Sequence, residues 1–210
     1  MAHATVRVGR PPFAFRVQGP DDWMLLETAP NTWERSVERI LADRAVELGR
    51  LPARQRRQLA ALLEDVVAAA QQTGVVLSLV KLARDASDRL FCGSLALSWY
   101  DSTPLRADLA FARLAAGEAR RVEELDTPAG PALLRREALP QPIPALELFG
   151  DGLSHSAQAF LPVAGTCWTA LVTGTVGHAS HAGLLDLLVR RMVRSLRVQP
   201  QPRDRPLQFQ

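Results

Sequence analysis

The segment SAQAFLPVAGTCWTALVTG, residues 156–174, followed by HAGLLDLLVRRMVRSLRV, residues 181–198, decides the fold of this chain. Its first part holds two apolar runs separated by PVAG, which predicts two strands joined by a short turn. In its second part apolar residues recur at three- and four-residue spacing, which predicts a helix over residues 181–196. The side chains expected to point inward from this helix are Leu184, Leu185, Leu188, Met192 and Leu196.

The N-terminal third has the same two kinds of pattern. FAFRV, residues 13–17, and WMLLE, residues 23–27, alternate like strands around GPDD, which predicts a hairpin. A helix is expected from the cap Asn31 to about Gly49, and a second after Leu51-Pro52 up to Gly74. The apolar face predicted for the second helix consists of Leu59, Leu62, Leu63, Val66, Val67 and Ala70.

Two long adjacent strands are expected next, VVLSLVKLARD at residues 75–85 and LFCGSLALSWY at residues 90–100. In the second strand alternation puts Phe91, Leu95, Leu97 and Trp99 on one face and Cys92, Ser94, Ala96 and Ser98 on the other. This pattern is expected of a sheet with one face covered by helices.

The remaining chain is expected to hold a short helix over residues 105–116, a strand pair around TPAG within residues 120–137, and a proline-rich loop over residues 139–152. The expected organisation is a flexible N-terminus over residues 1–10, a single domain over residues 11–198, and a disordered proline-rich tail over residues 199–210.

Composition narrows the class of protein. The chain has 210 residues, 47% of them hydrophobic and 22% charged, as in an ordinary globular domain. No apolar run approaches the ~20 residues that span a bilayer, and the N-terminus lacks a signal pattern, so we expect a cytoplasmic protein without a membrane span. Its net charge is only +3, with basic residues interspersed among acidic ones, which argues against a nucleic-acid partner.

Catalytic, metal and cofactor sites are not expected. His155 with Ser156 or Cys167 could form a nucleophile and base, but G-x-S-x-G is missing and alternation separates His155 from Ser156. His178 and His181 flank a helix start and lack further metal ligands, so we expect them to serve the turn. No nucleotide-binding glycine motif is present, and Cys92 and Cys167 are expected to be buried, reduced thiols.

Two sets of residues are candidates for docking a protein partner. The loop at residues 139–152 combines backbone-restricting prolines with apolar side chains, and it either caps the sheet or anchors an interface. Its candidate partner-binding residues are Pro142, Ile143, Leu146, Leu148 and Phe149. The arginines at positions 54, 56, 57, 190, 191, 194 and 197 are either a solubilising face or a docking surface for an acidic partner.

The order of these segments resembles the Mog/PsbP-like superfamily, which includes PsbP, Mog and the bacterial LpqN and DcrB groups. FAFRVQGPDDWMLLE is similar to its opening hairpin, QAFLPVAGTCWTALVTG to its late strand pair, and LLDLLVRRMVRSLRV to its closing helix. The resemblance implies an α/β/α sandwich with a central, mostly antiparallel sheet. It also implies binding proteins without shared catalytic residues.

The expected function is therefore that of a non-enzymatic adaptor or chaperone, plausibly an accessory factor of a secretion system or another multiprotein machine. A small-molecule or lipid carrier is the alternative, because Trp23, Phe91, Trp99, Phe160 and Trp168 lie on strands that could line a pocket. Core packing is the simpler use of these aromatic side chains. A serine or cysteine hydrolase is the remaining alternative.

Overall fold

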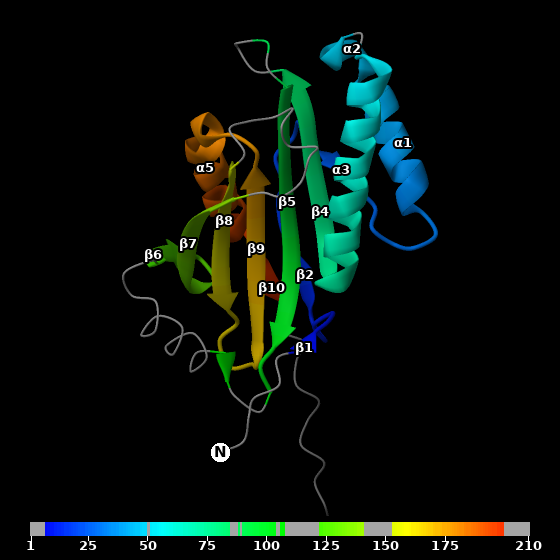
Figure 1. Ribbon diagram of the computed structural model, residues 1–210. Helices are drawn as coiled ribbons and strands as arrows, with labels where there is room; N and C mark the ends of the chain where they lie inside the picture. Colours follow the sequence, from blue (N-terminus) through cyan, green and yellow to red (C-terminus); the bar gives the residue numbers. More distant parts are fainter. Residues whose placement is uncertain are drawn as a thin grey trace, which may run out of the picture.

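The computed structural model describes residues 7–49, 51–84, 88, 90–103, 106–107, 122–140 and 153–199 (Figure 1). Most of the expected helix at residues 105–116 lies outside these ranges. So does the expected loop beyond Pro140, with all five of its candidate partner-binding residues. The expected tail lies outside them beyond Gln199.

A mixed fold forms around one large sheet, whose strands run in the order β3-β4-β5-β9-β8-β7-β6 (Figure 1). Each of these pairings is antiparallel, and β1 pairs antiparallel with the end of β5. The strands are β1 (Arg7–Val8), β3 (Met24–Leu25), β4 (Val75–Arg84), β5 (Leu90–Asp101), β6 (Val122–Thr127), β7 (Gly130–Pro140), β8 (Leu153–Pro162) and β9 (Trp168–Val176). The strand pairs predicted around residues 85–88, TPAG and PVAG are confirmed.

The predicted hairpin between residues 13–17 and 23–27 is wrong. β2 (Ala14–Arg16) pairs with β10 (Arg197–Gln199) in a separate two-stranded sheet, whereas β3 pairs with β4. A turn does form, because the N–H of Trp23 donates to the carbonyl of Pro20. The two strands do not pair with each other beyond this turn. Phe15 of β2 packs against Trp99 with ring centroids 5.1 Å apart, whereas β3 pairs with the outer edge of β4.

The helix predicted from Asn31 to Gly49 is broken in two, α1 (Trp33–Asp43) and α2 (Ala45–Leu48). The N-cap residue of α1 is Thr32 and not, as predicted for the longer helix, Asn31. The Thr32 side chain makes no capping hydrogen bond. The break lies at Arg44, whose guanidinium bonds Glu47 at 2.6 Å. Gly49 follows α2 with φ +68°, a backbone conformation that glycine adopts at little cost.

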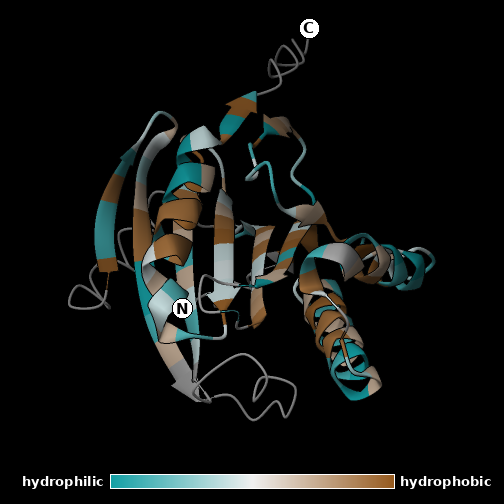
Figure 2. Cartoon of the chain, turned by 90° about the horizontal axis from the view of Figure 1, so that it is seen from above, coloured by the Kyte–Doolittle hydropathy of each residue, from teal (hydrophilic) through white to brown (hydrophobic). Residues whose placement is uncertain are grey.

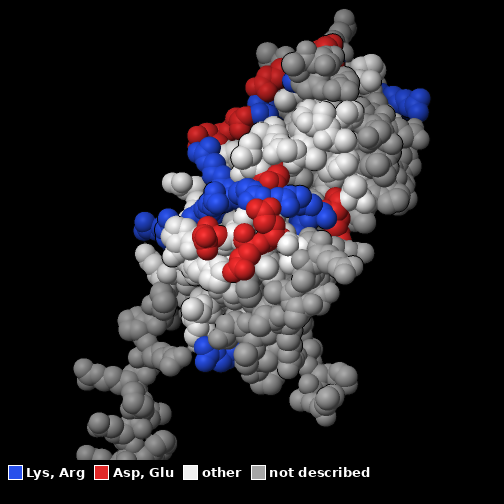
Figure 3. Space-filling view, turned by 90° about the vertical axis from the view of Figure 1, so that its left-hand side faces the viewer, with Lys and Arg blue, Asp and Glu red and all other residues white. Residues whose placement is uncertain are grey.

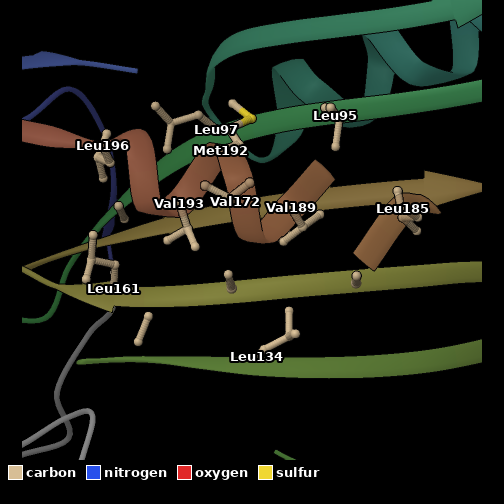
Figure 4. Packing of buried hydrophobic residues seen from close by; sticks show 14 of the residues in the cluster. Leu95, Leu97, Leu134, Leu161, Val172, Leu185, Val189, Met192, Val193 and Leu196 are labelled. Atoms are coloured by element: carbon tan, nitrogen blue, oxygen red, sulfur yellow. The ribbon is translucent and has the colours of Figure 1, made fainter. Parts of the chain in front are cut away.

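One face of the sheet carries α5 (Ala182–Ser195), which the 3₁₀ turn Ala179–His181 precedes. The buried side chains of this helix lie directly on those of β5, β7, β8 and β9 (Figure 4). They are Leu185, Val189, Met192 and Val193, followed by Leu196. Leu184, predicted to point inward, is 48% exposed, because it lies a quarter-turn from the buried stripe.

The opposite face carries α1, α2 and α3 (Ala53–Gln72), which pack near β4 at the other side of the sheet (Figures 1 and 2). The apolar face predicted for α3 is confirmed, with Leu59, Leu62, Leu63, Val67 and Ala70 buried and Val66 half-buried. Helices therefore flank both faces, as the predicted α/β/α sandwich requires. None of the described helices has the length and apolarity needed to cross a membrane.

Candidate ligand-binding cleft

A cleft of about 420 Å³ lies between α3 and the central strands. Its volume lies within the range typical of small-molecule sites. We call it the α3–sheet cleft. It is lined by Leu62, Asp65, Val66, Ala69, Ala70, Thr73, Val75, Ser78, Val80, Cys92, Ser94, Ala96, Ser98, Tyr100, Ser154, Gln158, Leu171, Thr173, Thr175, Val176 and Gly177.

The floor of the cleft is formed by small and polar side chains in register across β5, β9 and β8. Ser94 of β5 lies opposite Thr175 of β9, and Ala96 lies opposite Thr173. On the other side of β9, Thr173 lies opposite Gln158. Because paired residues of antiparallel strands point to the same face, these side chains form adjoining rows under α3.

The hydroxyl groups of this floor have no hydrogen-bond partner within the part of the chain that the structure describes. Among the described residues, the side chains of Ser94, Ser98, Thr173 and Thr175 make no hydrogen bond with one another or with a backbone group. A neighbouring hydroxyl, Ser156 Oγ, is fully buried and also unpaired. Buried polar groups normally find a partner, so these hydroxyls are available to water or to a bound molecule.

The wall that α3 contributes is apolar, with Leu62, Val66, Ala69 and Ala70 turned toward the strands. Asp65 is the one charged residue among the described residues that line the cleft. No lysine or arginine of the described chain lines it, although the sequence has 25 basic residues. A cleft without cations offers no counter-ion to a phosphate or a carboxylate.

Two ionisable groups of the cleft are held neutral by burial. Burial raises the pKa of the Cys92 thiol to about 12, and it raises the pKa of the Tyr100 hydroxyl as well. The thiol is therefore protonated at neutral pH and is a poor nucleophile. Both cysteines are free, but the prediction that they are buried is not borne out, because both residues are half-buried.

The structure does not assemble the hydrolase candidates. His155 pairs with Val176 and Ser156 with Thr175, so the two side chains point to opposite faces of β8, as predicted. Cys167 precedes Trp168 at the other end of β9, nine residues from the partner of His155 and therefore roughly 30 Å away along the strands. Neither nucleophile is thus within hydrogen-bonding reach of that imidazole.

The histidines at the start of α5 serve the turn, as predicted. His178 Nδ1 accepts a hydrogen bond from the Ser180 N–H at 3.1 Å. The His181 ring packs edge-on against Phe91 with centroids 4.8 Å apart. Within the described residues, no group of three or more histidine, cysteine or acidic side chains could hold a metal ion.

Glu123 belongs to a closed ring of four ion pairs, in which Arg136 and Arg190 each bind both Glu123 and Asp186. The four N–O distances are 2.6, 2.8, 2.6 and 2.7 Å. Hydrogen bonds from Arg190 and Arg136 lower the pKa of Glu123 to about 2. The ring fastens α5 to the β6–β7 pair, where Figure 3 shows blue and red side chains in contact.

Four of the five aromatic side chains considered for a pocket belong to the core instead, whereas Phe160 is half-buried and belongs to neither core cluster. Trp23, Phe91 and Trp99 are buried in the α5 cluster, and Trp168 packs against it. Some of the residues that line the cleft could be predicted from the sequence. They are the small and polar residues that alternate with large apolar ones in residues 90–100. A second signal is the alternation of Thr173 and Thr175 with apolar or small residues in TALVTGTV, a segment interpreted above as an apolar run.

Comparison with known proteins yields little. No family model matches the sequence, and no curated protein matches it. Among solved structures the chain is similar to LpqN, described as involved in cell envelope biogenesis of Mycobacterium tuberculosis, with 11% sequence identity over 95% of this chain and 93% of LpqN. The TM-score is 0.48, so the likeness extends at most to a related fold. Membership of the Mog/PsbP-like superfamily stays a prediction.

Proposed function

We propose that this protein is a non-enzymatic binding protein that holds a small, uncharged molecule in the α3–sheet cleft. The observation that carries the proposal is the set of unpaired hydroxyls on the cleft floor, facing an apolar helix. Such a site suits a ligand with one apolar side and one side that exchanges hydrogen bonds with Ser94, Ser98, Thr173 and Thr175.

The charges around the cleft restrict the ligand further. Asp65 adds a negative charge at the wall, and no described cation compensates it. An anionic ligand would therefore lose its hydration without gaining an ion pair, which costs several kcal/mol for a desolvated charge. We thus favour neutral molecules over phosphates, nucleotides and carboxylates.

The experiment compares two fluorescent probes that share an aromatic skeleton. N-phenyl-1-naphthylamine is neutral, whereas 1-anilinonaphthalene-8-sulfonate is anionic. We expect saturable, stoichiometric binding of the neutral probe to the native protein, and at least about tenfold weaker binding of the sulfonate. Tighter binding of the sulfonate, or no saturable binding of the neutral probe, would refute the proposal.

A matched pair of variants locates the probe. Ala69 and Ala68 are adjacent, exposed residues of α3, but only Ala69 is among the described lining residues. Ala69→Trp is expected to fill the cleft and abolish binding, while Ala68→Trp is expected to bind like the native protein. Equal affinities in the two variants, at equal melting temperatures, would place the probe elsewhere.

The adaptor or chaperone role expected from the sequence stays a prediction, as do the link to secretion and the cytoplasmic location. Its candidate residues, from Pro142 to Phe149, lie outside the described residues. Native mass spectrometry of protein purified from its own cells separates the two roles. A co-purifying small molecule supports the carrier, and a stoichiometric protein partner supports the adaptor.

A further inference from the structure

The outer side of α5 combines two features that the core does not explain. Leu184 is 48% exposed and Leu187 is 64% exposed, although the helix buries four other apolar side chains. Arg191 and Arg194 follow at spacings of four and three residues and are exposed as well. At 3.6 residues per turn, all four side chains lie in one stripe opposite the buried side of the helix.

The arginines of this stripe differ from their neighbour Arg190. Arg190 is neutralised by Glu123 and Asp186 in the ion-pair ring. Arg191 and Arg194 have no carboxylate within ion-pair distance among the described residues, and their side chains make no other polar contact there. Asp186 of α5 and Glu123 of β6 are thus both bound to arginines at the flank of the helix, and the stripe itself stays positive.

Two further arginines extend the positive charge beyond the end of α5. Arg197 folds back so that Nη1 donates to the carbonyl of Arg194 at 2.7 Å. Arg16 of β2 lies opposite Arg197 in the small sheet, and both side chains are exposed. Four like charges at one end of a helix repel one another, and an acidic partner would relieve that repulsion.

We propose that this stripe is the docking site of an acidic, amphipathic protein segment, which places apolar side chains on Leu184 and Leu187 and carboxylates on Arg191 and Arg194. The stripe is ~15 Å long from its first leucine to its last arginine, about three helical turns. The proposal does not depend on a ligand in the α3–sheet cleft, because α5 lies on the opposite face of the sheet.

Other occupants fit less well. A second copy of the chain would bring the same leucines and arginines, so an antiparallel pair would set arginines on leucines. Nucleic acid would leave the two leucines without apolar contacts. A membrane surface would favour apolar and basic residues side by side along the helix, whereas here Leu184 and Leu187 occupy one half and Arg191 and Arg194 the other.

The test is site-specific photo-crosslinking in the source cell, with p-benzoylphenylalanine replacing Leu187 in the full-length protein. We expect a protein adduct whose crosslinked peptide is rich in Asp and Glu. The double variant Arg191→Glu with Arg194→Glu should reduce the adduct at least about tenfold, since the contact then becomes repulsive. The control Arg54→Glu with Arg57→Glu reverses two exposed arginines of α3 and should leave the adduct unchanged.

Three outcomes would overturn the proposal: the absence of an adduct, an adduct with lipid, nucleic acid or a second copy of the chain, or a protein adduct that charge reversal does not reduce. Circular dichroism melting of each variant accompanies the experiment. Because every substituted residue is exposed, melting temperatures should stay within a few degrees of the native value.

Discussion

The two faces of the central sheet are built from alternate residues of the same strands and serve different ends. On the α5 face, Leu95, Leu97 and Val172 are completely buried under an apolar helix. On the α3 face, their neighbours Ala96 and Thr173 line a cleft and are only half-buried. One strand can thus supply both a core and a binding floor, because its period of two separates the two sets.

The two faces differ in how completely side chains fill the space between the sheet and the helices that cover it. The cluster under α5 consists of buried apolar side chains, so its stability follows from buried apolar area and from the fit between side chains. The α3 face leaves about 420 Å³ open, and its hydroxyls contribute little to folding while they remain unpaired. Substitutions on the first face should therefore change stability, and those on the second should change binding.

The largest expected effect comes from Leu185→Ala, which removes a side chain that is 1% exposed between α5 and the sheet. The free energy of unfolding should fall by about 2–5 kcal/mol, through lost burial and the cavity left behind. Urea denaturation measures this change. Leu187→Ala, on the same helix but 64% exposed, should change it by no more than about 0.5 kcal/mol. Equal losses in the two variants would contradict the assignment of the core face.

The next effect comes from Gly174→Ala, where α5 crosses closest to β9. A Cβ at this position would lie 2.5 Å from Leu185 Cδ1, 2.8 Å from Val189 Cγ2 and 2.9 Å from Leu95 Cδ2. Overpacking should cost about 1–3 kcal/mol by urea denaturation.

The control for this substitution is Gly183→Ala at the start of α5, where an added Cβ meets no heavy atom within 4 Å. Alanine favours a helix more than glycine, so this variant should match or exceed the native stability. A stable Gly174→Ala protein would mean that α5 can move away from the sheet without cost.

Much of this architecture could be predicted from the sequence, because its signals are local. The strand pairs around residues 85–88, TPAG and PVAG and the apolar side of α3 follow from alternation, periodicity and turn residues. Pairings between distant segments carried no such signal. β2 pairs with β10 across most of the chain, so the nearer segment β3 was taken as its partner instead.

The cleft was harder to foresee than the sheet. Alternation showed that Ser94, Ala96 and Ser98 share a face, but it could not show that α3 stands over them without filling the space. The ion-pair ring was missed for a similar reason, since Glu123 and Arg190 are 67 positions apart. Both features depend on where a helix lies relative to the sheet, and the hydrophobic pattern of the sequence alone does not specify that placement.

A smaller effect is expected from Glu123→Gln, which opens the ion-pair ring beside the α5 core. The pKa of Glu123 is lowered to about 2 in the folded protein, below the ordinary value of 4.5. Its carboxylate therefore stabilises the fold above pH 4.5, and this contribution is lost as the pH falls toward 2. Because the side chain is 44% exposed, solvent screening limits the contribution to about 1 kcal/mol.

The measurement is urea denaturation of native protein and variant at pH 7 and at pH 2. Glu123→Gln should be less stable than the native protein at pH 7, and the difference should nearly vanish at pH 2. Glu124→Gln is the control, because Glu124 points to the other face and has no ion pair among the described residues. A difference for Glu123→Gln that persists unchanged at pH 2 would show that the ring acts through packing rather than charge.

The smallest expected effect is that of Thr173→Val on the α3 face, for which the reciprocal swap Val172→Thr at the adjacent residue of the α5 face is the matched comparison. Thr173→Val removes a hydroxyl without an internal partner from the cleft floor, so stability should stay within about 0.5 kcal/mol of the native value or rise slightly. Val172→Thr places a hydroxyl in a completely buried apolar cluster and should cost about 1–3 kcal/mol. Urea denaturation measures both changes. A loss above about 1 kcal/mol for Thr173→Val would mean that the hydroxyl supports the fold, and the α3 face would then be structural rather than a surface kept for binding.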